Sequence, residues 1–404
     1  MTHPRLQDTL DALSKLISFE TVSDQPNLPL IEWAAATLEN AGLNVNIHPA
    51  SEKGKANLTA LIMPQGSTAD APPLMFSGHT DVVPVTDQQW NSDPFVMEIK
   101  DGKAYGRGAV DMKGFVALMM VYAPLFQQRA NDLNRPVIFA FTHDEETDMS
   151  GAYGLCESLP TKPDTIVVGE PTGMKIVDGH KGVAILTTRV KGHSVHSSQP
   201  YKGINANLIL SDIIQFLKKI AQEKAAAPIA GSRFIPPYTS MNIGTISGGS
   251  ALNITAVGAH MQWEFRPEPN DATAMNIVES LNSYSKDLVE AYKVDDAAPE
   301  IETVVNVNLP PLAPTKDNTA REFCARLTGE NQTEVAPYGT EGGVFQLGLK
   351  DQSGNQPGVV ICGPGGIEMA HQANEYISLE QLEKGAHFMD KALEDLCQDI
   401  SKPT

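Results

Sequence analysis

The sequence predicts an α/β protein in which a smaller α+β segment interrupts a layered α/β domain. Strands alternate with helices over residues 1–180, which is typical of layered α/β architecture. The middle of the chain instead predicts two helices and about four strands, and α/β character returns from Ile301. The length of 404 residues suits two or three domains of roughly 100–200 residues each.

The first part of the chain predicts helices and then short buried strands. Leu6, Leu10 and Leu13 recur at helical spacing, and a second helical pattern ends at Gly42. Apolar runs predict strands, with a helix at 115–128 between them, at residues 43–47, 58–63, 74–76, 137–141 and 165–168. Several runs end in polar clusters, which is where open α/β sheets place their functional residues.

The middle and the end of the chain complete this organisation. Strand patterns cover 183–191, 241–246 and 253–265, and helical patterns cover 205–219 and 271–292. Farther on, Gly358–Gly363 predicts a buried strand and 379–393 a terminal helix. We therefore expect one domain formed by residues 1–180 and 296–404, and an inserted domain formed by residues 181–295.

Composition narrows the classes of protein. With 49 acidic and 30 basic residues the net charge is −19, which disfavours nucleic acid as a partner because phosphate binding needs clustered Lys and Arg. The longest apolar stretch, 116–126, is shorter than the ~20 residues of a membrane span, so no membrane partner is expected. The amphipathic N-terminus does not resemble a signal peptide, and the four cysteines lack CxxC spacing. We expect a cytoplasmic protein.

Two strand-end clusters contain residues that suit a metal site. His79 is followed two residues later by Asp81, and a carboxylate can orient a metal-bound histidine. Asp111 lies in YGRGAVDMKG, where it replaces the last glycine of GxGxxG, so a phosphate loop is disfavoured. The alternatives are an ordinary loop for the first cluster and a helix N-cap for Asp111.

Three further positions add carboxylates and a second imidazole. Glu145 and Glu146 follow Asp144 at a strand end, where adjacent carboxylates repel unless they are solvated, protonated or bound to a cation. Glu170 ends an apolar strand, and His371 follows a glycine-rich turn. An exposed acidic loop is the alternative for the Glu pair. Together five positions form a mixed nitrogen and oxygen set that suits Zn²⁺, Co²⁺ or Mn²⁺. They are His79, Asp111, one residue of the Glu145–Glu146 pair, Glu170 and His371. One bridging carboxylate would let them hold two ions that share a hydroxide.

These segments resemble a known family, the di-zinc amidohydrolases that include acetylornithine deacetylase, succinyl-diaminopimelate desuccinylase, aminoacylase and carboxypeptidase G. The resemblance covers nearly the whole chain, through SGHTDVVP, YGRGAVDMKG, HDEETDMSGA, VVGEPTG and AHQANEY. HKG, GHSVHSSQPYKGINA, GTEGGVFQ and GPGGIEMAHQANEYI look most like acetylornithine deacetylase. The resemblance implies a mixed-sheet catalytic domain sandwiched by helices and split by an α+β lid, through which the proteins commonly dimerise.

Carried over to this sequence, the resemblance implies a role for each candidate. His79 and Glu170 would bind one metal, Glu146 and His371 the other, and Asp111 would bridge the two. Glu145 matches the general base, and Asp81 matches the carboxylate that orients His79.

The lid and one later loop supply further candidates. His196 matches a lid histidine that stabilises the oxyanion in a neighbouring subunit's site, although a His in a Ser-rich turn can be only a polar turn residue. Arg266 resembles the position that holds a substrate carboxylate, with Asn253 assisting, and a surface salt bridge is its alternative. Glu341 is a hypothetical partner for a substrate ammonium; the alternative is a solvated loop carboxylate.

The implied reaction is metal-dependent hydrolysis of an N-acyl amino acid, with Glu145 taking the proton of a bridging water. The implied substrate is Nα-acetylornithine, cleaved to ornithine and acetate in arginine biosynthesis. Succinyl-diaminopimelate desuccinylase, or another deacylase or dipeptidase of the family, is the alternative. A non-catalytic scaffold is disfavoured because every ligand position and the base are present.

Overall fold

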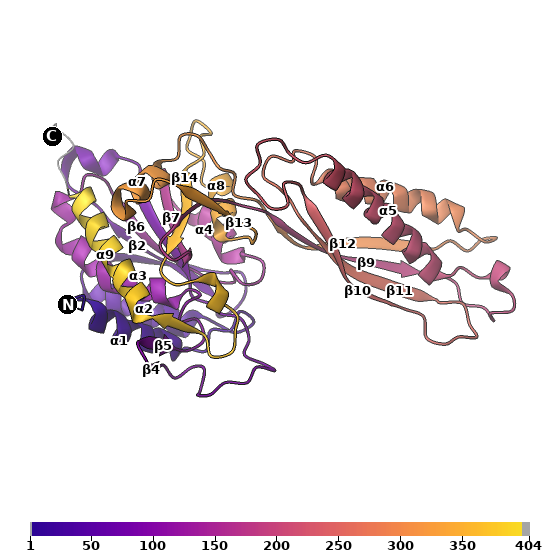
Figure 1. The fold of residues 1–404 in the computed structure, drawn as a ribbon, viewed down its shortest axis with the longest axis horizontal. Helices are drawn as coiled ribbons and strands as arrows, with labels where there is room; N and C mark the ends of the chain where they lie inside the picture. Colours follow the sequence, from indigo (N-terminus) through magenta and orange to yellow (C-terminus); the bar gives the residue numbers. More distant parts are fainter. Residues whose placement is uncertain (1, 398–404) are drawn as a thin grey trace. The chain divides into compact units, whose positions relative to one another are not determined.

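The computed structural model describes residues 2–397, which form two compact units (Figure 1). The larger unit comprises the described residues up to Gly179, then Pro314–Glu334 and the residues from Thr340 onward. The smaller unit comprises His180–Ala313 and Val335–Gly339. The smaller unit therefore interrupts the larger one along the chain.

The larger unit contains an eight-stranded mixed sheet with the order β1-β2-β6-β3-β7-β14-β8-β13. Its strands are β1 (Asn44–Pro49), β2 (Ala56–Ile62), β3 (Leu74–His79), β6 (Val137–Thr142), β7 (Thr165–Pro171), β8 (Ile176–His180), β13 (Thr333–Ala336) and β14 (Gly358–Gly363). The neighbours β6, β3, β7 and β14 are parallel, whereas β1, β2 and β6 pair antiparallel. The four parallel strands therefore bring their carboxyl ends to one edge of the sheet.

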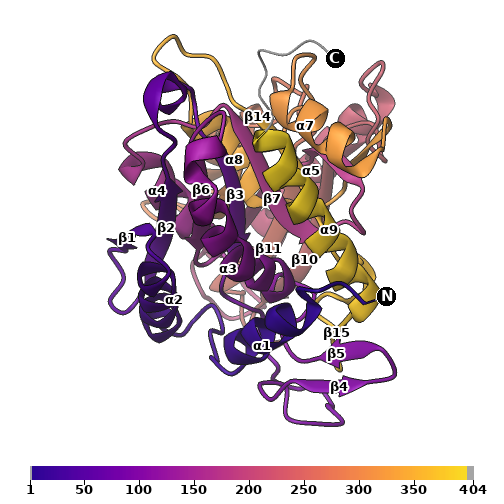
Figure 2. The same cartoon turned by 90° about the vertical axis from the view of Figure 1, so that its left-hand side faces the viewer.

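Helices cover this sheet because its central strands are apolar on both faces. All residues of β3, β6 and β14 are buried, as expected for parallel strands inside an α/β layer. Figure 2 shows α3 and α9 crossing one face, and α3 contacts β3, β6 and β7 there. The helices are α1 (Leu6–Ile17), α2 (Leu28–Asn40), α3 (Lys113–Gln128), α4 (Ser150–Ser158), α7 (Thr319–Thr328), α8 (Glu341–Gly348) and α9 (Leu379–Leu396), with 3-10 turns at Gly66–Asp70, Ala130–Asp132 and Ile367–Met369. The predicted fold class is confirmed.

A small three-stranded sheet, ordered β15-β5-β4, joins two distant parts of the larger unit. Its strands are β4 (Glu98–Lys100), β5 (Lys103–Tyr105) and β15 (Tyr376–Ser378). Tyr376 pairs with Tyr105, so the segment just before residue 106 lies beside the segment just after residue 375. This pairing brings two loops together at the candidate site.

The smaller unit is a four-stranded antiparallel sheet with two helices against it (Figure 1). The sheet order is β10-β11-β9-β12, and the elements are β9 (Val183–Lys191), β10 (Ser240–Gly248), β11 (Gly258–Arg266), β12 (Glu300–Leu309), α5 (Ala206–Ala226) and α6 (Asn276–Ala291), with a 3-10 turn at Pro200–Lys202. Alternate residues of β11, namely Met261, Trp263 and Phe265, are buried in the core that α5 and α6 cover. This period of two is typical of a sheet with one buried face.

The boundaries of the smaller unit differ from the predicted 181–295. β12 pairs with β9 along its length, for example Val305 with Leu186, and this pairing extends the unit to Ala313. The sequence predicts the return of α/β character from Ile301, because a local pattern does not say which sheet a strand joins when its partner is distant along the chain. Within residues 2–397 no helix is both long and apolar enough to cross a membrane.

Candidate metal centre

The carboxyl end of β3 presents His79 to the interior of the larger unit. The side chain is 0% exposed, and its Nδ1 lies 2.9 Å from the main-chain oxygen of Asp81. A carbonyl only accepts, so in the neutral ring Nδ1 carries the proton and Nε2 is left as an electron-pair donor. His79 Nε2 lies 3.1 Å from Asp111 Oδ1 and 3.6 Å from Glu170 Oε1.

Asp111 lies between two groups of donor atoms. The first group is His79, Asp111 and Glu170; the second is Asp111, Glu146 and His371; within each group the donor atoms lie within 4.8 Å of one another. His371 Nε2 is 3.4 Å from Asp111 Oδ2 and 3.1 Å from Glu146 Oε1. Asp111 is not a helix cap, because Met112 is the N-cap residue of α3 and no side chain caps that helix. The structure thus brings all five predicted ligands together in the predicted pairs.

Asp81 contacts this centre in a different way from the prediction. Its main-chain carbonyl, rather than its carboxylate, makes the closer contact with His79, since Asp81 Oδ1 lies 3.6 Å from Nδ1. The carboxylate instead accepts hydrogen bonds from the amides of Glu145 at 3.2 Å and Glu146 at 3.3 Å, and from the Ser23 hydroxyl at 2.7 Å. Asp81 therefore orients His79 through its backbone and holds the Glu145–Glu146 turn through its side chain.

The negative charge of Asp144 is compensated by its own partners, so the three successive acidic residues 144–146 do not simply repel one another. Its carboxylate accepts from Lys55 Nζ at 2.8 and 3.0 Å and lies 2.9 Å from His143 Nδ1. Lys55 and His143 are both buried. Glu145 and Glu146 remain as the carboxylates that face the centre, and the alternative of an exposed acidic loop does not describe them.

Electrostatics at the centre favour a positive charge. Burial and the neighbouring Glu170 raise the pKa of Glu145 well above its usual range, and burial together with Asp111 raises the pKa of Glu146 to about 7. Although burial opposes protonation of His79, the Glu170 charge and the bond to Asp111 raise its pKa well above the usual value. Carboxylates crowded in this way hold protons unless a cation compensates them.

The donor set fits divalent metal ions. It combines imidazole nitrogen with carboxylate oxygen, which suits Zn²⁺, Co²⁺ or Mn²⁺. Glu170 Oε1 is buried and has no hydrogen-bond partner among the residues that the structure describes, although it faces His79 Nε2. An unpaired buried carboxylate oxygen costs free energy, and coordination to a cation removes that cost.

The structure places Glu341 inside the larger unit. The residue is 0% exposed, its Oε2 lies 3.4 Å from the Ser77 hydroxyl, and burial raises its pKa to about 7. A solvated loop carboxylate is therefore excluded. The carboxylate also offers no exposed surface to a substrate ammonium, so its burial argues against the predicted contact.

The smaller unit carries the other three candidates. His196 is exposed, and its Nδ1 accepts from the Ser198 amide at 3.2 Å, which puts the proton of the neutral ring on Nε2. Arg266, at the end of β11, donates to Glu264 at 2.7 Å and is partly exposed. Asn253 is exposed, and its main-chain oxygen accepts from the Ser197 amide at 3.0 Å, beside the His196 turn.

Residues that sequence reasoning did not single out also lie around the centre. Glu375 is buried beside Asp111, and Arg107 and Gln88 connect it to the segment that contains His371. Glu375 and Arg107 lie inside the quoted AHQANEY and YGRGAVDMKG segments, so each stood close to a chosen ligand. Their partners are distant in sequence, and no local pattern joins them.

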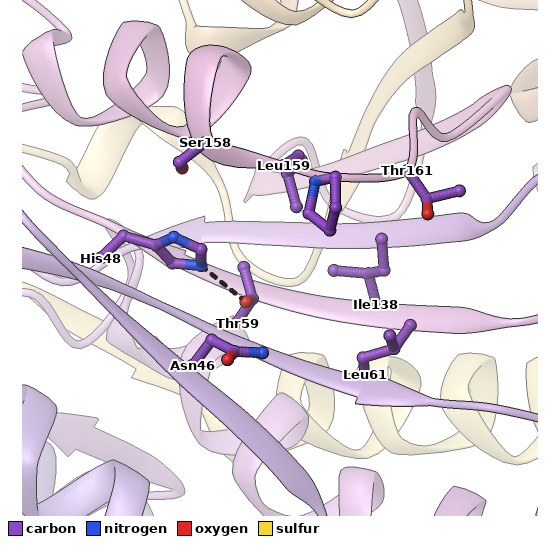
Figure 3. A pocket seen from close by; sticks show the side chains of 9 residues that line it. Asn46, His48, Thr59, Leu61, Ile138, Ser158, Leu159 and Thr161 are labelled. Atoms are coloured by element: carbon purple, nitrogen blue, oxygen red, sulfur yellow. Dashed lines mark hydrogen bonds between the residues drawn. The ribbon is translucent and has the colours of Figure 1, made fainter.

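Two other features of the larger unit do not belong to this centre. A pocket of about 230 Å³ next to β1, β2 and β6 is lined by Asn46, His48, Thr59, Leu61, Ile138 and Ser158–Thr161 (Figure 3), none of which is a candidate ligand. The grouping of His3, His387 and Asp390 is already satisfied, since His3 Nε2 donates to Asp390 at 2.8 Å and Nδ1 accepts from the Arg5 amide.

Comparison with known proteins identifies the chain that carries these donor groups as a metal-dependent amidohydrolase. Residues 75–395 match the model of peptidase family M20/M25/M40, and the chain belongs to that family, which confirms the predicted resemblance. It is 30% identical to an acetylornithine deacetylase of Proteus mirabilis (strain HI4320) over 397 residues, covering 98% of this chain and 97% of the relative.

Solved structures show the same fold at lower identity. A tripeptidase from Staphylococcus aureus superposes with a TM-score of 0.75 at 19% identity, covering 98% of this chain and 99% of the other. An M20 family metallo-carboxypeptidase from Sulfolobus solfataricus gives 0.71 at 18% identity, with coverages of 96% and 99%. Human carnosine dipeptidase 1 gives 0.70 at 18% identity, with coverages of 98% and 97%.

Proposed function

We propose that this chain hydrolyses an N-acyl amino acid, namely Nα-acetylornithine, to ornithine and acetate, as a step in arginine biosynthesis. The observation that carries the reaction class is Asp111, which two donor groups share at the carboxyl edge of the sheet. The substrate is supported by the 30% identity to an acetylornithine deacetylase along nearly the full length of both chains.

The side chains of the larger unit would divide the chemistry between them. His79, Asp111 and Glu170 would hold one divalent ion, and Asp111, Glu146 and His371 the other; we propose zinc. When bound, the ions supply Lewis acidity, which acidifies water and polarises the acyl carbonyl.

Glu145 would move the proton. Its carboxylate takes a proton from the attacking water, whose oxygen bonds to the acyl carbon. When the carbon–nitrogen bond breaks, Glu145 returns that proton to the departing amine, and the second water proton leaves when the new carboxylic acid ionises, so the products are the carboxylate and the free amino acid.

The smaller unit would contribute substrate contacts and a dimer interface. The Nε2–H of His196 would donate to the oxygen that becomes negative, in the site of a second copy, and Arg266, assisted by Asn253, would hold the substrate carboxylate. An interface through this unit is supported by β10, an edge strand of the sheet, and by exposed apolar side chains at Ile246 and Leu252, the latter 99% exposed. Sedimentation velocity should show a dimer that Leu252→Asp weakens.

The substrate test is a comparison of kcat/KM after metal reconstitution. Acetylornithine, acetylcitrulline, acetylmethionine and succinyl-diaminopimelate differ in side-chain charge and acyl group. Acetylornithine should be preferred, and EDTA should abolish hydrolysis until metal is returned. A preference for succinyl-diaminopimelate would assign the desuccinylase activity instead. If none of these four amides is hydrolysed in a metal-dependent way, the proposed function is contradicted.

A further inference from the structure

A buried glutamate just before β15 binds the turn that presents Asp111. Glu375 is 1% exposed, and its Oε1 accepts from the amides of Val110 at 2.9 Å and Asp111 at 3.1 Å. Its Oε2 accepts from the Gly108 amide at 2.9 Å and from Arg107 at 2.6 Å. One carboxylate therefore receives three amides and a guanidinium from residues 107–111.

These bonds control where Asp111 can lie. The turn precedes α3, and no regular secondary structure pairs these three amides, so the Glu375 carboxylate is their acceptor. Bonds to a charged acceptor are shorter and stronger than neutral ones. Because the amide of Asp111 is among the donors, the backbone of the shared ligand is held directly.

The same network reaches the loop that contains His371. Arg107 also donates to Gln88 Oε1 at 2.5 Å, and Gln88 Nε2 donates to the main-chain oxygen of His371 at 2.8 Å. The ring of Trp90 covers the Arg107 guanidinium at 5.2 Å. Two ligands from distant parts of the chain are thus connected through consecutive hydrogen bonds.

We propose that Glu375 and Gln88 are positioning residues of the metal centre, Glu375 for Asp111 and Gln88 for His371, with Arg107 coupling them. The inference rests on the proposed metal centre. Neither side chain belongs to a donor group, so each acts only through the residue it holds. Groups that hold metal ligands typically change metal affinity by roughly 10–100-fold when they are replaced.

Metal titration of the metal-free protein by calorimetry, with Co²⁺ and with Zn²⁺, tests this. Gln88→Met removes both polar atoms of a half-exposed side chain. It should lower the affinity for one of the two metal ions by roughly 10–100-fold while the fold is retained. Glu375→Gln should lower the affinity for both metal ions, because both donor groups share Asp111. It should also alter the visible absorption of bound Co²⁺. In the metal-free protein, Glu375→Gln should also accelerate amide hydrogen exchange at residues 108–111.

Tyr122→Phe is the matched control, since it deletes a buried hydroxyl that donates to the Ala386 carbonyl at 2.8 Å, away from both donor groups. It should lower stability and leave metal affinity unchanged. If Glu375→Gln does not fold, Gln88→Met decides the matter. If the folded variants bind metal with affinities within twofold of wild type, this inference is overturned but the proposed function is not. A wild-type protein that binds no divalent metal would overturn the proposed function as well.

Discussion

Replacing Glu145 with glutamine separates proton transfer from metal binding. Glutamine has nearly the same shape, but its amide does not accept a proton from water. Glu145 belongs to neither donor group, and the hydrogen bond that holds it, to the Asp81 carboxylate, is donated by its backbone N–H. The substitution should therefore leave both groups of ligands in place.

The expected loss is that of one general base. Removing such a group typically lowers turnover by roughly 10²–10⁴-fold, which corresponds to about 2.7–5.4 kcal/mol of transition-state free energy. The assay is kcat on acetylornithine with the metal content of the same sample measured by atomic absorption. Glu145→Asp retracts the carboxylate by roughly 1.5 Å, one carbon–carbon bond, and a misplacement of that order can cost roughly 10²-fold.

Two results would refute this reasoning. Near-normal turnover of a metal-replete Glu145→Gln sample would show that another group takes the proton. Loss of one metal from the same variant would show that Glu145 is a ligand, so its activity would say nothing about a base.

Three further substitutions test the smaller unit and the packing behind the site. His196→Ala should lower kcat by roughly 10²–10³-fold, the usual cost of one oxyanion donor, without changing metal content. Gly169→Ala should lower the free energy of unfolding by about 1–3 kcal/mol in a denaturant titration, because a Cβ there would lie 1.9 Å from Phe115 Cδ1 in a filled core. Although burial tends to raise the pKa of Asp271, hydrogen bonds from Lys224 and from nearby groups lower it below the usual carboxyl value. The ionised carboxylate therefore stabilises the fold at every pH above the ordinary carboxyl pKa of ~3.9. This stabilisation is lost as the pH falls through the lower pKa of the folded state. Asp271→Asn should therefore lower the thermal midpoint at neutral pH, and the difference from wild type should shrink in acid.

Each of these three predictions has a control or an outcome that would contradict it. Inactive Glu145→Gln and His196→Ala proteins should regain activity when mixed, and no recovery after confirmed subunit exchange would contradict action in a second copy. Unchanged unfolding of Gly169→Ala would mean that the ring of Phe115 moves aside without cost. Asp287→Asn, at an exposed position of α6, controls for the loss of charge, and a pH-independent effect of Asp271→Asn would contradict the linkage.

The predicted fold class follows from local patterns that burial enforces. Residues 74–76 and 137–141 are apolar throughout because β3 and β6 are covered on both faces, and the polar residues that follow them lie at one sheet edge because these strands are parallel. β12 was assigned to the wrong domain for the complementary reason. Its place in the smaller unit comes from its pairing with β9, which is a long-range contact.

The ligand set was predictable because its chemistry is local. His79, Asp111 and Glu170 each follow or precede a recognisable strand or helix, and the family resemblance supplied their pairing. The roles of Asp81 and Glu341 were harder to predict, since they depend on which backbone groups and which core atoms surround a carboxylate after folding. Roles for Glu145 and for the lid residues remain predictions.

Residue type and position thus indicate a metal site in this chain, because side chains that follow parallel strands lie at one edge of the sheet, while the family resemblance implies the reaction. Only the tertiary structure decides how the ligands are held. Glu375 acquires its proposed role from amides and a guanidinium more than 260 residues away, and β12 acquires its sheet from a strand more than 100 residues earlier. Such contacts form when the chain closes on itself, and no periodicity within a single segment records them.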